Sequence, residues 1–195
     1  MSANLTPSKD SIYQLKITLR EIRPPIWRRI QVPGTITFHE LHLIIQRAMG
    51  WWNEHLHQYI INNVYYLEPD PDTSTEDIDE RKAVLAQVVR REKAKFLYEY
   101  DFGDDWLHDI LVEKLMNPEP GKQYPICCAG KRACTPEDCG GPWGYYNLLE
   151  AVGDPSHPEH EELLEWVGGE YDPEAFDLNE VNEELKPFRK RKKKQ

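Results

Sequence analysis

Residues 12–49, IYQLKITLREIRPPIWRRIQVPGTITFHELHLIIQRAM, decide the fold. Leu15, Ile17 and Leu19 alternate with polar residues, which is the period of a β-strand buried on one face. Two prolines interrupt this pattern, and residues 26–32 predict a second strand that returns beside the first. The stretch therefore begins with a predicted pair of strands.

An amphipathic helix is predicted directly after the strand pair, over residues 38–49. Thr37 and Glu40 have the spacing of a capping box, and Gly50 is placed to end the helix. The apolar face of this helix consists of Phe38, Leu41, Ile44, Ile45 and Ala48. We expect Leu41 and Ile44 to be buried against the sheet.

The order of the next elements predicts the fold class. A hairpin over residues 56–67, a short helix around 82–91 and a second hairpin over 96–115 follow the first helix. This order predicts an α+β fold, in which a mainly antiparallel or mixed sheet carries a helix packed on one face. The same order is compatible with a β-grasp layout with an added strand.

The chain changes character after residue 116 and becomes acidic, with a helical pattern. Three Xaa-Pro-Glu segments predict helices, because each offers a cap and a proline in the first turn. The predicted helices begin near residues 136, 144, 158, 173 and 177. The chain is therefore divided into an α+β sheet core, a C-terminal appendage of cysteine-containing loop and helices packed on that core, and a basic disordered tail. The ranges of these three regions are 11–115, 116–186 and 187–195.

The composition excludes several protein classes. Of the 195 residues, 39% are hydrophobic and 30% are charged, which is typical of a globular chain and excludes one too polar to fold. No run of 18 apolar residues occurs, so no membrane span is predicted. The N-terminus lacks the apolar segment of a secretory signal. We expect a cytoplasmic protein.

The charge is distributed unevenly. The formal net charge is −10, yet the last ten residues, KPFRKRKKKQ, carry seven basic side chains. Without them, 17 basic residues stand against 34 acidic ones, so the folded body is predicted not to bind nucleic acid. The basic tail could contact nucleic acid or an acidic neighbour, and the alternative is a solvated end.

Four cysteines within thirteen residues form the first candidate site: Cys127, Cys128, Cys134 and Cys139. Three thiolates and either His108 or His160 could complete a tetrahedral zinc site. The chain contains no Cys-Xaa-Xaa-Cys knuckle, however, and reduced cysteines are the expected state in a cytoplasm. The alternative is therefore a set of partly buried packing side chains.

A second candidate site is the turn of the second hairpin. Asp101, Asp104, Asp105 and His108 could hold a divalent cation through oxygen and nitrogen ligands. The alternative is a Gly-Asp turn that joins two strands and exposes its acids. Two histidine pairs could likewise bind a metal ion or only form hydrogen bonds. They are His55 with His57 at the start of a strand, and His39 with His42 on the first helix.

Five segments of the chain together resemble a known family. They are YQLKITLREIRPPIWRRIQVP (13–33), HLHQY (55–59), YEYDFGDDWLHDI (98–110), YPICCAGKRACTPEDCGGPWGY (124–145) and DPSHPEHEELLEWVGGEYDPEAFDLNEVN (154–182). Together they resemble the plasmid pRiA4b ORF-3-like family, whose members are also described as passenger proteins of insertion sequences. The resemblance implies a prokaryotic protein carried by plasmids, mobile elements or chromosomes. It implies no recombinase activity here, because the chain shows no serine-recombinase nucleophile context.

Two functional hypotheses follow. The first is a non-enzymatic binding or accessory module, with a protein among the partners considered. The second is a metal-assisted hydrolase built from Asp101, Asp104, His108 and the cysteines. The first is favoured, because no complete catalytic set can be identified in the sequence. Zinc is the one cofactor that either hypothesis names.

Overall fold

The centre of the protein is an eight-stranded sheet with the spatial order β5-β4-β3-β6-β7-β1-β2-β8. The computed structural model describes residues 10–69 and 76–189. The strands are β1 Ile12–Leu19, β2 Trp27–Pro33, β3 His57–Ile61, β4 Val64–Leu67, β5 Ile78–Asp79, β6 Lys95–Tyr100, β7 Trp106–Met116 and β8 Ile126–Lys131. Neighbouring strands are antiparallel except β4 and β5, which are parallel. The predicted α+β class and mainly antiparallel sheet are confirmed.

The strand periodicity places the core on one face of this sheet. In β1, Leu15, Ile17 and Leu19 are at most 2% exposed, as their alternation predicts. β1 lies between β2 and β7, so its backbone is paired on both sides. The prediction of the first strand pair is confirmed.

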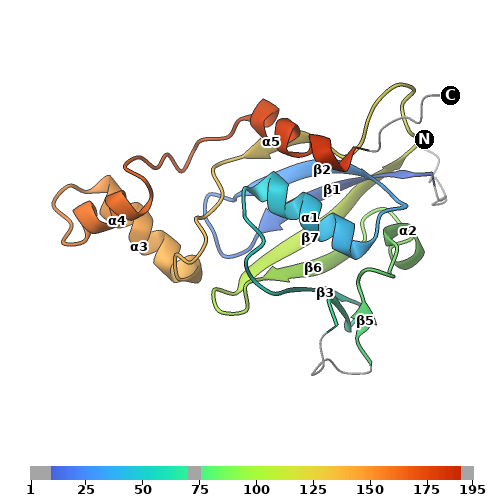
Figure 1. Ribbon diagram of the computed structural model, residues 1–195, viewed down its shortest axis with the longest axis horizontal. Helices are drawn as coiled ribbons and strands as arrows, with labels where there is room; N and C mark the ends of the chain where they lie inside the picture. Colours follow the sequence, from blue (N-terminus) through green and yellow to red (C-terminus); the bar gives the residue numbers. More distant parts are fainter. Residues whose placement is uncertain (1–9, 70–75, 190–195) are drawn as a thin grey trace.

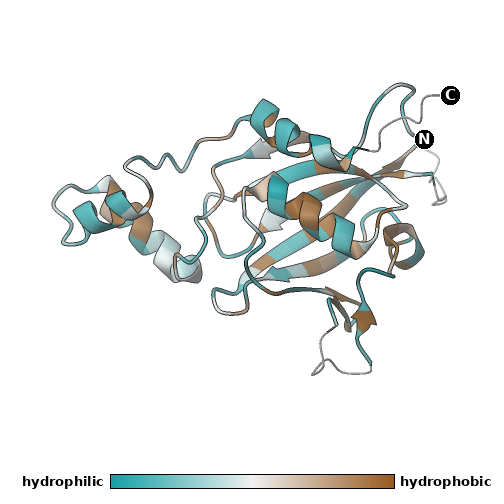
Figure 2. Cartoon of the chain, viewed as in Figure 1, coloured by the Kyte–Doolittle hydropathy of each residue, from teal (hydrophilic) through white to brown (hydrophobic). Residues whose placement is uncertain are grey.

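The helix α1, Phe38–Met49, crosses the core face of the sheet (Figure 1). Thr37 and Glu40 form both hydrogen bonds of the capping box, and Gly50 ends the helix with a φ of 101°. Leu41 and Ile44 are buried, so the predicted apolar face is confirmed. Figure 2 shows hydrophobic and hydrophilic residues alternating around α1 and along the strands beneath it.

The second half of the chain differs from the prediction in two respects. Residues 126–131 form β8, which pairs with β2, so the sheet extends beyond the predicted core of 11–115. The segments near 136 and 173 form turns, so the helix starts predicted there are wrong. A tertiary hydrogen bond joins the two segments, because the N–H of Ala133 donates to the carbonyl of Pro173, and this contact favours turns over helices there.

The C-terminal helices lie in two places (Figure 1). They are α3 Gly141–Gly153, α4 His160–Trp166, α5 Leu178–Glu184 and a 3₁₀ turn, η1 Lys186–Phe188, while α2 Leu85–Val88 is a single turn in the first half. α3 and α4 pair at one end of the molecule, whereas α5 lies beside α1. No helix of the described residues has the length and apolar character that a bilayer crossing requires.

Contacts with the folded body extend to residue 189, two residues past the predicted start of the tail at residue 187. Phe188 packs against the core, and Arg189 donates hydrogen bonds to the carbonyls of Pro125 and Asn182. The disordered tail was predicted from residue 187. Residues 190–195, which carry most of its positive charge, lie outside the described residues.

Candidate functional site

Four of the seven histidines line one pocket of about 290 Å³. His39 and His42 come from α1, His57 begins β3, and His55 lies two residues before it. The remaining lining residues are Asn53, Glu54, Leu56, Gln58, Leu67, Glu68 and Phe102. The two histidine pairs that the sequence analysis left open therefore meet at one place, which we call the histidine pocket.

A buried carboxylate joins two of these histidines. Glu80 is 0% exposed and lies between β5 and α2. Its Oε1 is 2.8 Å from Nδ1 of His39, and its Oε2 is 2.8 Å from Nε2 of His57. A carboxylate without partners would be costly to bury, so the two imidazoles stabilise it and are oriented by it.

His42 is held as a neutral ring. Its Nδ1 accepts a hydrogen bond from the hydroxyl of Tyr98 at 2.7 Å, and its Nε2 donates to Oδ1 of Asn53 at 2.5 Å. The ring stacks on His57 with centroids 3.4 Å apart and an angle of 3° between the planes. Burial, with a smaller contribution from His57, lowers the pKa of His42 to about 2.

His55 belongs to a second group at the edge of the pocket. Its Nε2 lies 3.2 Å from Oδ1 of Asp138 and 3.7 Å from Oδ2 of Asp101. The three ligand atoms lie within 4.8 Å of one another. The Nε2 atom is buried and makes no hydrogen bond of ordinary geometry to any described residue. This set of one imidazole and two carboxylates is called the His-Asp-Asp group.

Two tight turns orient the carboxylates of Asp101 and Asp138 toward His55. Asp101 and Asp138 have φ values of 58° and 57°, in the left-handed region that Asp tolerates better than most residues. The N–H of Asp101 donates to the carbonyl of Leu56, which ties the turn to the start of β3. Oδ1 of Asp101 accepts the N–H of Gly103, so Oδ2 is the oxygen nearer to His55.

The segment 132–140 lies against the turn between β6 and β7. The N–H of Gly140 donates to Oδ2 of Asp104 at 3.1 Å. Gly141 has a φ of 67°, and a Cβ there would lie 2.5 Å from the carbonyl oxygen of Asp104. The hydroxyl of Tyr100 donates to Glu137. Close backbone approach therefore brings Asp138 to His55.

The four residues of the candidate site at the hairpin turn do not all lie together in the structure. Asp101 belongs to the His-Asp-Asp group, Asp104 holds Gly140, and Asp105 is an exposed turn residue with a φ of 58°. His108 lies inside the core, because Trp106 and His108 share the buried face of β7 and the intervening Leu107 faces the other way. His108 therefore does not join the turn carboxylates.

The four cysteines are free thiols and do not gather into a ligand set. Cys127 pairs with Ile30 across β2 and β8, and a register shift leaves Cys128 out of that pairing. Burial raises the pKa of Cys127 to about 11 and of Cys134 and Cys139 to about 12. No cysteine belongs to a cluster of three or more potential metal ligands in residues 10–69 and 76–189.

Asp138 and Glu80 were missed by the sequence analysis as site residues. Asp138 follows an Xaa-Pro-Glu segment that predicted a helix, and Glu80 follows an acidic loop in which it is one carboxylate among several. A local signal for Asp138 does exist. The sequence Asp138-Cys139-Gly140-Gly141 is typical of a turn with positive φ angles rather than of a helix.

The chain is similar to known proteins over most of its length. A family model described as plasmid pRiA4b ORF-3-like protein matches residues 11–180. The uncharacterized protein y4hQ of Sinorhizobium fredii (strain NBRC 101917 / NGR234) is 41% identical over 174 residues, which cover 88% of this chain and 89% of y4hQ. The crystal structure of the protein of unknown function MM3350 from Methanosarcina mazei Go1 is similar with 39% identity and a TM-score of 0.81, covering 89% of this chain and 99% of MM3350.

Proposed function

The chain belongs to the plasmid pRiA4b ORF-3-like family, and on that premise we propose that it is a cytoplasmic, non-enzymatic binding module whose site holds a divalent metal ion. The family description names a plasmid, and the proposed role is an accessory one connected with plasmids or mobile elements. The site is the His-Asp-Asp group beside the histidine pocket. The metal is a first-row ion such as Zn²⁺, which accepts imidazole and carboxylate ligands.

The spacing of the three ligand atoms carries this proposal. Ligand atoms about 2.1 Å from a tetrahedral ion lie roughly 3.4 Å from one another. The observed separations from Nε2 of His55 are 3.2 Å to Asp138 and 3.7 Å to Asp101. Three protein ligands leave a fourth position for water or for a ligand group from the adjoining pocket.

The surface around the pocket supports a binding role. Leu56 and Phe102 line the pocket and are 66% and 47% exposed. Exposed apolar side chains that gather at one site mark places where a partner or ligand covers them. The zinc site predicted from the cysteines remains a weaker proposal, because their raised pKa values oppose the thiolate form that zinc needs.

A titration of Zn²⁺ and Mn²⁺ into the full chain by isothermal calorimetry tests the proposal. We expect one ion per chain, with an affinity reduced at least about tenfold in Asp138→Asn, since a ligand charge is lost while Asn still tolerates the positive φ. Asp105→Asn is the matched control, because Asp105 also has a positive φ in a turn but lies outside the ligand group. Equal affinities in the two variants would reject the site.

One observation favours the metal-assisted hydrolase as a second candidate. His57, oriented by Glu80, lines the same pocket as His55, so an imidazole paired with a carboxylate adjoins the proposed ion. In this candidate His57 is the base, and His108 is not part of the site. Metal-dependent cleavage of p-nitrophenyl esters that is lost in His57→Gln, with the metal still bound, would support the hydrolase over the binding module.

A further inference from the structure

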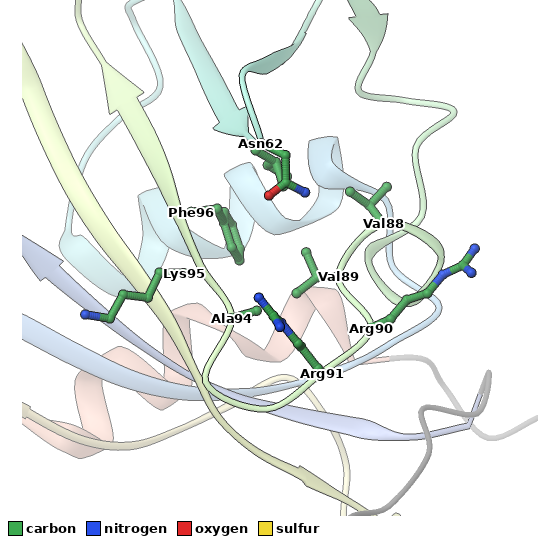
Figure 3. A pocket seen from close by; sticks show the side chains of 9 residues that line it. Asn62, Val88, Val89, Arg90, Arg91, Ala94, Lys95 and Phe96 are labelled. Atoms are coloured by element: carbon green, nitrogen blue, oxygen red, sulfur yellow. The ribbon is translucent and has the colours of Figure 1, made fainter.

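Figure 3 shows a second pocket, which has a volume of about 370 Å³. It lies at the far end of β3 from the histidine pocket. Three segments form it: the turn after β3, the chain that follows α2, and the start of β6. The lining residues are Ile61, Asn62, Val88, Val89, Arg90, Arg91, Ala94, Lys95 and Phe96. Its volume falls in the usual range for small-molecule sites.

The walls of this pocket are fixed to the sheet. The hydroxyl of Tyr13 donates to the carbonyl of Val89 at 2.8 Å, which holds the chain after α2 against β1. The N–H of Val112 donates to the carbonyl of Ala94 at 2.9 Å, and the N–H of Lys93 donates to the carbonyl of Val112 at 2.7 Å. These bonds hold the opposite wall on β7, so the pocket is preformed.

The charge of the pocket is opposite to that of the chain. The protein has a formal net charge of −10, yet Arg90, Arg91 and Lys95 all line this one cavity. None of the three forms an ion pair with another described residue. In Figure 3, the side chain of Arg91 reaches toward Ala94 and Val89, whereas Arg90 and Lys95 extend outward. Unneutralised cations on an acidic protein attract an anion.

The floor of the pocket is apolar, whereas polar and charged side chains form its rim. Val89, Phe96 and Ile61 are 3%, 4% and 4% exposed, so only the edges of these aliphatic and aromatic side chains face the opening. The amide of Asn62 faces them from the turn after β3 (Figure 3). A flat phosphate backbone would leave this concave apolar surface uncovered, whereas a compact molecule with an apolar end would cover it.

We propose that this pocket binds a small anionic molecule with an apolar or aromatic body, placing the anionic group at Arg91 and the body against Phe96 and Val89. The guanidinium group matches the geometry of a phosphate or carboxylate. This site is independent of the His-Asp-Asp group, since the two sites share no residue.

Calorimetry on the full chain with phenyl phosphate and with inorganic phosphate, at one salt concentration, tests the proposal. We expect phenyl phosphate to bind at least about tenfold more tightly than phosphate, because only phenyl phosphate covers the apolar surface. Arg91→Gln should weaken phenyl phosphate binding by about tenfold or more, since a charge-assisted hydrogen bond is lost. Lys131→Gln is the matched control, because it removes one positive charge from β8 at the opposite edge of the sheet.

Four results would overturn the proposal. They are no binding of phenyl phosphate at millimolar concentration, equal affinity for the two phosphates, an equal loss in Arg91→Gln and Lys131→Gln, and tighter binding of a single-stranded oligonucleotide that displaces phenyl phosphate. The last result would assign the pocket to nucleic acid. Backbone amide shifts at Asn62, Arg91 and Ala94 on addition of phenyl phosphate would place the ligand in the pocket, and shifts confined to other residues would contradict it.

Discussion

Tyr98 lies directly opposite His108 in the antiparallel pairing of β6 and β7, and the centroids of their rings are 5.3 Å apart. Both side chains are 0% exposed. The hydroxyl of Tyr98 reaches His42 of the histidine pocket, whereas neither ring nitrogen of His108 makes a hydrogen bond of ordinary geometry to any described residue. Burial lowers the pKa of His108 to about 4. His108 is thus a neutral core residue beneath the site.

Replacement of His108 by leucine should stabilise the protein at neutral pH. A buried polar group without a partner costs roughly 1–3 kcal/mol, and leucine fills a similar volume without that cost. We expect the free energy of unfolding at pH 7 to rise by about 1 kcal/mol, measured by urea denaturation. A loss of more than about 2 kcal/mol would show that the imidazole makes stabilising polar contacts.

The same variant should be less sensitive to acid. A histidine whose pKa is about 4 in the folded protein, against about 6.5 when unfolded, takes up a proton more readily in the unfolded chain between these values. The destabilising effect of His108 is therefore smallest above pH 6.5 and grows as the pH drops toward 4. Between pH 7 and pH 5 the wild type should lose about 2 kcal/mol more than His108→Leu. Equal losses would contradict the lowered pKa.

Replacement of Glu80 by glutamine should destabilise the fold strongly. Glu80 accepts from His39 and His57 through different oxygens, and a glutamine amide can accept through only one of them. We expect a loss of about 3 kcal/mol in the free energy of unfolding at pH 7. Glu68→Gln is the control, because Glu68 pairs with Arg81 on the surface, and it should change stability by less than about 1 kcal/mol. Similar losses in both variants would contradict a special role for Glu80.

Replacement of Gly141 by alanine should weaken metal binding without touching a ligand. The new Cβ would meet the carbonyl oxygen of Asp104 at 2.5 Å and force segment 132–140 away from the turn, which would move Asp138 from His55. We expect at least a tenfold loss of Zn²⁺ affinity by calorimetry. Gly153→Ala provides the comparison, since a Cβ there meets nothing within 4 Å. An unchanged Zn²⁺ affinity in Gly141→Ala would show that the contact between segment 132–140 and the turn does not position Asp138.

Replacement of Leu41 by alanine should cost about 2–5 kcal/mol of stability, because Leu41 is 0% exposed in the centre of α1. Chemical denaturation measures the change. Leu178→Ala serves as the comparison, because Leu178 is 36% exposed at the start of α5 and should cost much less. A cost below about 1 kcal/mol for Leu41→Ala would contradict the packing of α1 on the sheet.

The elements of the first half were predictable because their signals are local. The period of two in Leu15–Leu19 and the capping box of Thr37 and Glu40 each depend on a few adjacent residues. β8 was missed because ICCAGK shows no clear alternation, and it becomes a strand by pairing with the exposed edge of β2. Tertiary pairing, rather than propensity, decides such a segment.

The site was only partly predictable, because its members come from distant segments. Asp101 was named from its turn, whereas Asp138 lies 37 residues later and reaches His55 through the contact between Gly141 and Asp104. His108 lies apart from the turn carboxylates, since two residues of strand separate it from the turn and alternation directs it into the core. Spacing along the chain shows which residues are near in sequence, and the contacts across the sheet and its turns decide which of them meet.

The left-handed backbone at Asp101 and Asp138 restricts what evolution can place there. The backbone at each position accepts glycine, asparagine and aspartate with little strain. Binding a cation would accept aspartate, glutamate, histidine or cysteine. Aspartate is the carboxylate that meets both demands, because glutamate is not favoured at a positive φ. Relatives that exchange these positions freely among glycine, asparagine and aspartate would preserve only the turn, whereas relatives that retain aspartate at both would preserve the ion.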